Sequence, residues 1–228
     1  YKFKVTAKNG DMAISKFSFR VQPDAIAEFT KIALYAFTDS GFSSPDSDFN
    51  GPSNPAGLVN GGPLWDTASD GSQYNVIEIY PDKSCYPAYM GQLCPGQHTS
   101  IRIPNGESRW FRFAMDINIS GDIGTFNLKS ITTQLQGDTA YPVSGMQSAN
   151  GVNIDSNNDF IWSPISTTTN IQLSTNDWTN GYGVPGLPSA NMAPETLSTS
   201  GASTAPASVK PAGVRTISTA PVTPATAT

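Results

Sequence analysis

The run RWFRFAMDINI, residues 109–119, constrains the fold more than any other stretch of the chain. Side chains along a strand point to alternate faces, so residues that recur at every second position share one face. Large apolar residues recur in this way five times, at Phe111, Phe113, Met115, Ile117 and Ile119. The residues between them are Trp110, Arg112, Ala114 and Asp116. The run therefore predicts a central β-strand with one face against a hydrophobic core.

The first 22 residues show the same alternation in two stretches. In the first stretch, one face is made of Tyr1, Phe3, Val5 and Ala7. In the second, which runs from Ile14, the inward face is made of Phe17, Phe19 and Val21. Asn9-Gly10 lies between them and is a tight-turn sequence, so the pattern predicts a β-hairpin.

Further strand-like runs follow, at residues 29–37, 74–81, 99–103 and 126–135. Residues 39–73 are rich in Gly, Ser, Asn, Asp and Pro, and a loop of this length usually carries function or contacts. No stripe with the helical period and helix caps is present. We therefore predict an all-β fold, as an antiparallel β-sandwich or a jelly roll.

Residues 160–188 mark a change in composition. They hold Trp162 and Trp178 between Asn-Gly and Gly/Pro turns, and we interpret them as a folded-back flap that both tryptophans anchor to a β domain of residues 1–188. Residues 189–228 are dominated by Ser, Thr, Ala and Pro. Such a tail buries too little apolar surface to offset its ordering entropy, which is typical of a disordered or O-glycosylated stalk.

The alternative for this tail is that a neighbouring subunit holds it. Residues 208–218 (SVKPAGVRTIS) would then lie along the exposed sheet edge of a partner, with Val209, Val214 and Ile217 as apolar contacts. We expect assembly of this kind, which makes the chain a subunit of a homo-oligomer or polymer.

Composition limits the classes of function. The 228 residues carry a net charge of −5 and 13 scattered Lys and Arg residues, which argues against nucleic acid because phosphate binding needs clustered cations. Charged residues make up 14% of the chain, and roughly 25% is usual in soluble domains; many exported surface proteins share this low charge. No run approaches the ~20 apolar residues of a membrane span, and no signal peptide precedes Tyr1, so we expect a processed N-terminus or an omitted preceding segment.

Two cysteines, Cys85 and Cys94, enclose the short segment YPAYMGQL. A metal pair or a redox pair would have closer CxxC spacing or further ligands, so a disulfide is the favoured interpretation. Closing so small a ring stabilises a fold by roughly 2 to 3 kcal/mol. A disulfide also indicates an oxidising compartment.

The sequence carries no recognisable catalytic motif. His98 is the one histidine, and no GxSxG, HExxH, P-loop or GxGxxG pattern supports it. A pair of carboxylates that meets only in the fold stays open, but the glutamates other than Glu195 are few: Glu28, Glu78 and Glu107. We therefore expect no enzyme activity.

The hexapeptide DSDFNG, residues 46–51, matches the first half of a calcium-binding loop. Asp46, Asp48 and Asn50 supply oxygen ligands at alternate positions, but Gly57 stands where the closing glutamate belongs. Residues 155–159 form a second acidic turn of similar oxygen density. Asp and Asn are also common turn formers, which is the alternative interpretation of both segments. No other cofactor is indicated.

Several aromatic residues lie in loop-like segments, where they would be able to stack on sugars. Trp65, Tyr86 and Tyr89 are the candidate glycan contacts, and Trp178 and Tyr182 occupy similar segments. Buried interfaces and cores use the same residue types, so packing is the alternative.

Three segments carry a family resemblance: YKFKVTAKNGDMAISKFSFRV, KIALYAFTDSGFSSP and the pair NDFIWSPIS and STNDWTNGYGVPGLP. Together they resemble β-rich domains of predicted secreted surface proteins of candidate-phyla-radiation (Patescibacteria) bacteria, over most of residues 1–188. In that family an early strand pair is followed by an FIWS and DWTNGY element that closes the domain. The resemblance implies a location outside the bacterial envelope, in a surface layer, a fibre or an adhesive structure.

We therefore expect a secreted, self-assembling structural protein of the cell surface, as the subunit of a surface layer or filament. The first alternative is an adhesin or carbohydrate-binding module on a stalk, with surface glycans as partners. The second is a viral capsid or spike protein.

Overall fold

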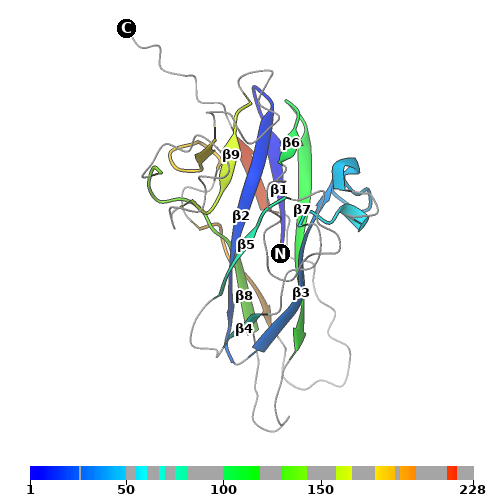
Figure 1. The fold of residues 1–228 in the computed structure, drawn as a ribbon, viewed down its shortest axis with the longest axis vertical. Coiled ribbons are helices and arrows are strands. Elements are labelled where there is room, and N and C mark those ends of the chain that lie inside the picture. Colours follow the sequence, from blue (N-terminus) through cyan, green and yellow to red (C-terminus); the bar gives the residue numbers. More distant parts are fainter. Residues whose placement is uncertain are drawn as a thin grey trace, which may run out of the picture.

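The protein is an all-β sandwich of two sheets with a shared hydrophobic interior, as the computed structural model shows (Figure 1). The structure describes residues 1–25, 27–49, 55–60, 67–69, 75–81, 100–118, 130–142, 158–165, 178–187, 191–198 and 215–219. The two β-sheets confirm the predicted all-β fold class. Within these residues, no helix is long and apolar enough to cross a membrane.

The first sheet has five strands. Their order is β12 (Arg215–Thr219), β1 (Lys2–Ala7), β7 (Ser108–Asn118), β3 (Ala27–Phe37) and β4 (Thr67–Ser69). The predicted central strand is therefore correct, because β7 lies in the middle of this sheet. Its inward face is buried at Phe111 and Phe113 but opens towards the end of the strand, where Ile117 is 37% exposed. Ile119 lies outside the described residues.

The second sheet has seven strands and is built on β2 (Met12–Pro23). The first half of β2 pairs with β6 (Ile101–Ile103) on one edge and β9 (Ile161–Ser163) on the other. Its second half pairs with β5 (Asn75–Ile79) and β8 (Ser130–Leu135). Beyond β9 and β8 lie the short strands β10 (Thr179–Asn180) and β11 (Glu195–Ser198).

The predicted hairpin of residues 1–22 is wrong, although both of its strands form. β1 pairs with β7 and β12, whereas β2 belongs to the opposite sheet. The chain turns at Asn9, which has a positive φ of 62°, and crosses from one sheet to the other. The reason is that both stretches carry a strong apolar face. A hairpin would leave these two faces side by side, but the crossing stacks them against each other with the core between.

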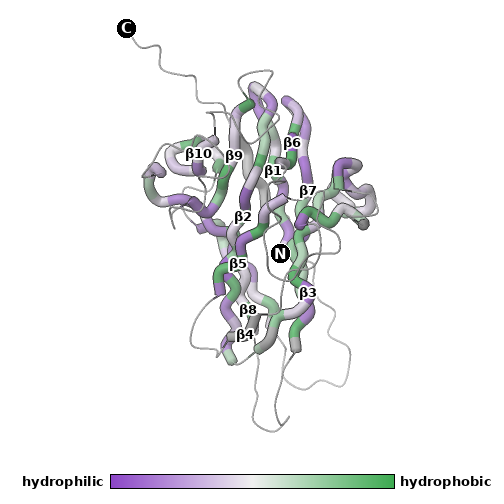
Figure 2. The backbone as a smooth tube through the Cα atoms, in the orientation of Figure 1, coloured by the Kyte–Doolittle hydropathy of each residue, from purple (hydrophilic) through white to green (hydrophobic). Residues whose placement is uncertain are grey.

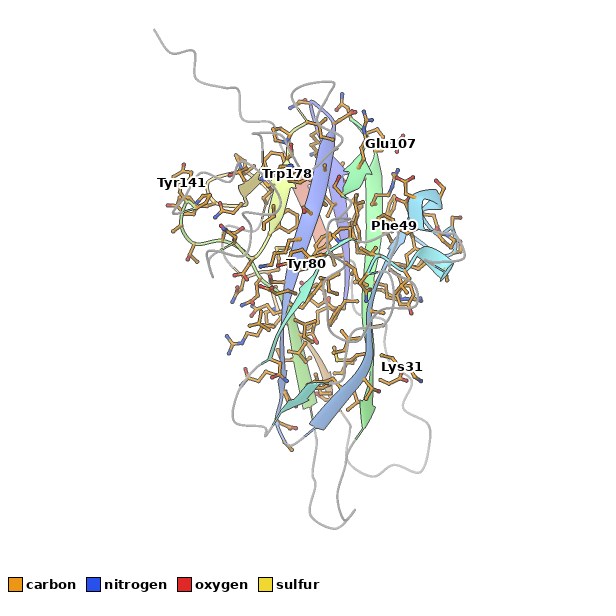
Figure 3. The ribbon with its side chains drawn as sticks, viewed as in Figure 1. Lys31, Phe49, Tyr80, Glu107, Tyr141 and Trp178 are labelled. Carbon is orange, nitrogen blue, oxygen red and sulfur yellow. The ribbon has the colours of Figure 1, made fainter. Side chains whose placement is uncertain are left out.

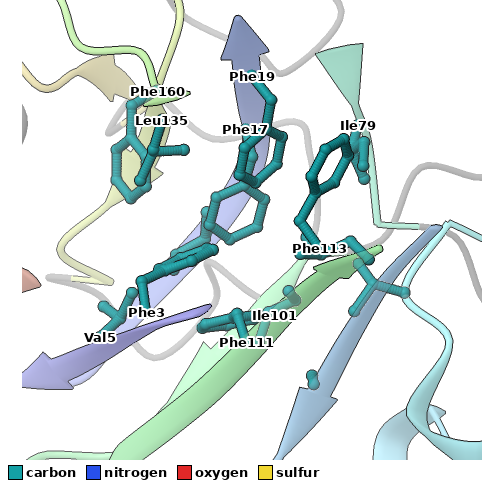
Figure 4. Packing of buried hydrophobic residues seen from close by; sticks show 14 of the residues in the cluster. Phe3, Val5, Phe17, Phe19, Ile79, Ile101, Phe111, Phe113, Leu135 and Phe160 are labelled. Carbon is teal, nitrogen blue, oxygen red and sulfur yellow. The ribbon is translucent and has the colours of Figure 1, made fainter. Parts of the chain in front are cut away.

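Phenylalanine rings fill the interior between the sheets (Figure 4). The ring of Phe19 stacks on that of Phe113 with centroids 4.1 Å apart, and Phe3 stacks on Phe111 at 5.0 Å. Phe17 contacts Phe3, Phe19 and Phe111, and its edge meets the Phe160 ring at 5.5 Å. Burying one such side chain contributes roughly 1.5 to 3 kcal/mol. Figure 2 shows the corresponding sequence pattern, with hydrophobic and hydrophilic positions interleaved along the strands.

The long loop after β3 is partly a continuation of the first sheet. It contains two short 3-10 helices, η1 (Ser47–Phe49) and η2 (Pro55–Gly57). The N–H of Asp46 donates to the Ala36 carbonyl (2.9 Å), and the N–H of Val59 donates to the Leu34 carbonyl (2.7 Å). Phe49, labelled in Figure 3, is fully buried. The described part of this loop therefore closes the side of the sandwich next to β3.

Candidate assembly site

The outer edge of β1 is occupied by β12, a strand from the Ser/Thr/Ala/Pro-rich tail (Figure 1). The two strands run in parallel, whereas all other pairs among the described strands are antiparallel. The register pairs Phe3 with Arg215 and continues without a shift to Ala7 with Thr219. An unpaired strand edge presents a row of N–H and C=O groups, and here a short piece of the tail satisfies them.

β1 is anchored to the body independently of the tail. Its other edge pairs with β7 over five residues, from Lys2 with Arg112 to Thr6 with Ser108. The inward side chains Phe3, Val5 and Ala7 are fully buried. The Tyr1 amino group donates to the Phe113 carbonyl at 2.9 Å. The edge that receives β12 is therefore built by the core and by β7.

Aromatic and cationic side chains cover the outward face of this edge. The Lys2 ammonium lies 4.4 Å from the centroid of the Phe42 ring, and the Lys4 ammonium lies 5.8 Å from that of Trp110. The Thr6 and Ser108 hydroxyls share a hydrogen bond of 2.8 Å. These contacts hold the polar face of β1 in place beside β7.

The predicted assembly residues are only partly within the described structure. Ile217 lies in β12 and pairs with Val5, inside the segment 208–218 that the sequence assigned to a sheet edge. Val209 and Val214 lie outside the described residues. The sequence favoured the edge of a neighbouring subunit; within one chain, the structure pairs β12 with that chain's own β1.

The beginning of the predicted tail belongs to the second sheet. β11 pairs with β8, from Glu195 with Thr133 to Ser198 with Ser130. Just before β11, the Met192 N–H donates to the Leu135 carbonyl (2.9 Å), and the Gln134 side chain donates to the Met192 carbonyl (2.6 Å). Residues 191–198 therefore form part of the β sandwich, although the sequence placed the boundary at residue 188.

Both predicted flap anchors are buried. Trp162 lies in β9, and its indole N–H donates to the Asn180 carbonyl at 3.1 Å, which joins β9 to β10. Trp178, labelled in Figure 3, packs in a small second cluster with Ala13 and Ile161. Its indole nitrogen is buried and has no hydrogen-bond acceptor among the residues that the structure describes. Since the ring is only 2% exposed, Trp178 has no free face for a sugar.

A buried carboxylate that sequence reasoning missed organises the flap. Asp138, fully buried, accepts hydrogen bonds from the backbone N–H groups of Asp159 (2.5 Å), Phe160 (3.3 Å) and Gly181 (2.7 Å). Burial raises the pKa of the Asp138 carboxyl to about 7, while these N–H donors act in the opposite direction. Nothing in the local sequence QGDTAYP distinguishes this aspartate from a turn former.

Asn180 completes this polar cluster. Its amide nitrogen donates to the Ala140 carbonyl (2.9 Å) and the Asn158 side-chain oxygen (3.1 Å). Its own side-chain oxygen accepts from the Tyr182 N–H at 3.2 Å. Asp138 and Asn180 therefore connect three segments that are distant in sequence. We call these two residues and their partners the polar hub.

At the calcium-like segment, the Asp46 carboxylate is already engaged. One oxygen accepts from the Arg109 Nε at 2.6 Å, and the other accepts from the Asp48 N–H at 3.0 Å. Gly57 has a φ of +87°, and a Cβ there would lie 2.4 Å from the Ala36 carbonyl oxygen, so no carboxylate side chain fits this position. Asn50 lies outside the described residues. Calcium binding stays a prediction, and the melting temperatures in EGTA and in calcium test it.

The other predicted site residues lie outside the described residues. These are Cys85 and Cys94 of the disulfide, and Trp65, Tyr86 and Tyr89 of the glycan site. Among the loop aromatics that are described, Tyr182 packs edge-on against Tyr141 with ring centroids 4.5 Å apart. Tyr141 is 69% exposed and is labelled in Figure 3. The described residues contain no group of three or more His, Cys, Asp or Glu that would hold a metal.

Comparison with known proteins gives no match: no family model, no curated protein and no solved structure resembles the chain significantly. The proposal for its function is therefore based on the geometry of the chain.

Proposed function

We propose that this chain is a self-assembling extracellular structural protein of the cell surface, the subunit of a surface layer or filament. Its tail docks on neighbouring subunits, and its work is packing and not catalysis. The observation that carries this proposal is the pairing of β12, a tail segment, with the outer edge of β1. A tail that forms a strand at a sheet edge has the chemistry needed to join subunits.

The geometry of such a joint also favours propagation. The donor is the tail of one subunit and the acceptor is the sheet edge of another, so the contact is heterologous. A heterologous contact leaves a free donor and a free acceptor at the ends of the assembly, and it grows unless the rotation closes a ring. A low content of charge, 14% of residues, suits a protein that packs closely against copies of itself.

Truncation after Ser198 tests the proposal. This end point keeps β11 and the Met192 contact with β8, whereas removal from residue 189 would damage the second sheet. The full chain should form ordered assemblies by light scattering and negative-stain electron microscopy, and the chain ending at Ser198 should remain folded without forming them. A chain lacking only residues 220–228 is the control, and it should assemble. Identical assemblies from the Ser198 truncation would contradict tail docking.

A second candidate, an adhesin or carbohydrate-binding module, is favoured by the exposed Tyr141 and its contact with the half-buried Tyr182. Two tyrosine rings in edge-to-face contact present apolar surface and hydroxyl groups together, as sugar sites do. A glycan array separates the two candidates. Binding that Tyr141→Ala abolishes, and that Leu197→Ala, at another exposed apolar side chain, leaves unchanged, would favour the module. A viral coat subunit would use the same packing, and localisation on cells or particles distinguishes it.

A further inference from the structure

We infer that β12 is exchanged between copies of the chain: β12 of one copy adds to the β1 edge of the next copy. The exchange keeps the parallel register from Phe3 with Arg215 to Ala7 with Thr219. This inference rests on the proposed function, and it specifies the two segments that form the joint and their alignment.

The first argument is that β12 is attached to one element alone. Among the described elements, its substantial contacts are all with β1. Among the described strands, the one that pairs with β12 is therefore β1. A copy of the same edge on another subunit offers the same backbone partners, so exchange keeps the strand pairing of β12.

The second argument is that the acceptor does not need its own β12 to fold. β1 is paired with β7 from Lys2 to Thr6, and Phe3 stacks on Phe111 inside the core. Removal of β12 would bare the backbone of a strand that is already fixed. Such an edge is a template for another strand of suitable chemistry, and β12 of a second copy is the segment known to fit.

The third argument is the length of chain before β12. Residues 199–214 separate the end of β11 at Ser198 from Arg215. Sixteen residues span at most roughly 55 Å when fully extended, which exceeds the roughly 40 Å diameter of a compact domain of this size. β12 is therefore able to reach the β1 edge of an adjacent copy while β11 remains on its own sheet.

The balance between the two arrangements then depends on protein concentration. A strand paired within its own chain and one paired with a neighbour make the same backbone hydrogen bonds. The intramolecular pair gains from the high effective concentration of a tethered strand. High subunit concentration favours the exchanged pair, because each exchange extends the assembly. The arrangement with β12 on its own β1 is thus the resting monomer.

A cysteine mixing experiment tests the exchange. Lys4 and Thr216 are paired in the register, so Lys4→Cys is made in one full-length chain and Thr216→Cys in another. The two are mixed in equal amounts, assembled and oxidised, and linked peptides are identified by mass spectrometry. With exchange, the 4–216 disulfide joins different chains at about a quarter of the junctions, the fraction expected for random mixing along a heterologous assembly. Lys8→Cys, beyond the last paired residue of β1, replaces Lys4→Cys as the control and should link at least tenfold less.

The outcomes separate this inference from the proposed function. Assemblies that form without the intermolecular disulfide, while a chain carrying both substitutions forms it internally, would overturn exchange and leave tail-dependent assembly standing. A full chain that stays monomeric at all concentrations, with the disulfide only internal, would overturn both. The intermolecular disulfide in the assembled fraction, and its absence from dilute monomer, supports exchange.

Discussion

Two buried regions of this protein are held together by opposite kinds of interaction. Between the sheets, the contacts are among aromatic rings of β1, β2 and β7. Beside the flap, one carboxylate and one amide, those of Asp138 and Asn180, connect separate backbone segments. Both regions exclude water. The stability of the first depends on how well the side chains fill the space, and that of the second depends on the direction of its hydrogen bonds.

This difference sets how each region responds to change. A ring can be replaced by another apolar group of similar volume at modest cost, because dispersion and burial are not directional. A buried acceptor of several N–H groups has no such substitute, since each N–H left without an acceptor costs about 1 to 3 kcal/mol. The contribution of the core to the free energy of unfolding should therefore be independent of pH, whereas the contribution of the polar hub should change with pH.

Removal of a core ring should have the largest effect. Phe17 contacts four other rings, so Phe17→Ala leaves a cavity and should lower the free energy of unfolding by about 3 to 5 kcal/mol. Urea denaturation at pH 5 and at pH 8 measures this, and the loss should be equal at both. Val76→Ala, at a position 46% exposed, is the control and should change stability by less than about 0.5 kcal/mol. A loss that differs strongly between the two pH values would mean that core and hub are not independent.

The pH dependence of stability should be the next largest effect. Burial raises the pKa of Asp138 in the folded protein to about 7, against 3.8 for an ordinary aspartate. The folded state thus binds this proton more tightly, so stability is highest near pH 4 and falls as the pH rises to about 7. A difference of one pKa unit is worth about 1.4 kcal/mol, and we expect a total decrease on the order of 3 kcal/mol. Flat stability over this range would show that the N–H donors cancel the burial.

Asp138→Asn isolates this contribution. The amide keeps one oxygen acceptor but turns an NH2 group towards backbone N–H donors, so it should lose about 1 to 2 kcal/mol at pH 5. Its stability should change less between pH 5 and pH 8 than that of the unchanged protein. Asp24→Asn, at an exposed carboxylate bonded to the Ser130 hydroxyl, is the matched control and should retain the full pH dependence. Equal pH dependence in Asp138→Asn and the unchanged protein would assign the titration to another group.

The smallest effect should come from an aromatic contact outside both interiors. Tyr141 meets Tyr182 edge-on but is mostly exposed, so Tyr141→Ala should change the free energy of unfolding by no more than about 0.5 kcal/mol. The same urea titration measures it. A loss above about 2 kcal/mol would place Tyr141 in the support of the flap and weaken its role as a surface for ligands.

The sequence was sufficient for the core because its pattern is local. Alternation at period two identified the inward residues of β1, β2 and β7, and Phe3, Phe17 and Phe111 are all fully buried. The same pattern did not reveal how the first two strands are connected. Two strands of alternating pattern joined by a turn are consistent with a hairpin and with a crossing between sheets. The crossing is favoured because it stacks the two apolar faces against each other.

The polar hub could not be predicted for a different reason. Asp138, Asn158 and Asn180 are spread over more than forty positions of the chain, and each looks like a turn residue in its own segment. Their role appears only when the fold brings the three segments together. The tail shows the same limit: the sequence placed residues 208–218 along the sheet edge of a partner, but it did not identify β1 as the strand that pairs with β12.

The parallel alignment of β1 and β12 also has a mechanical consequence. In a parallel pair, the beginning of one strand and the end of the other lie at opposite ends of the ladder, near Phe3 and near Thr219. The connecting chain enters β12 at Arg215, and β1 continues into its own subunit after Ala7, at the other end of the ladder. Tension applied to Arg215 and to Ala7 in opposite directions therefore acts along the strands and loads the backbone hydrogen bonds of the whole ladder together. An antiparallel pair pulled from its adjacent ends would instead open one bond at a time. If subunits join as proposed, this geometry makes the joint resist a pulling force with all of its backbone hydrogen bonds at once.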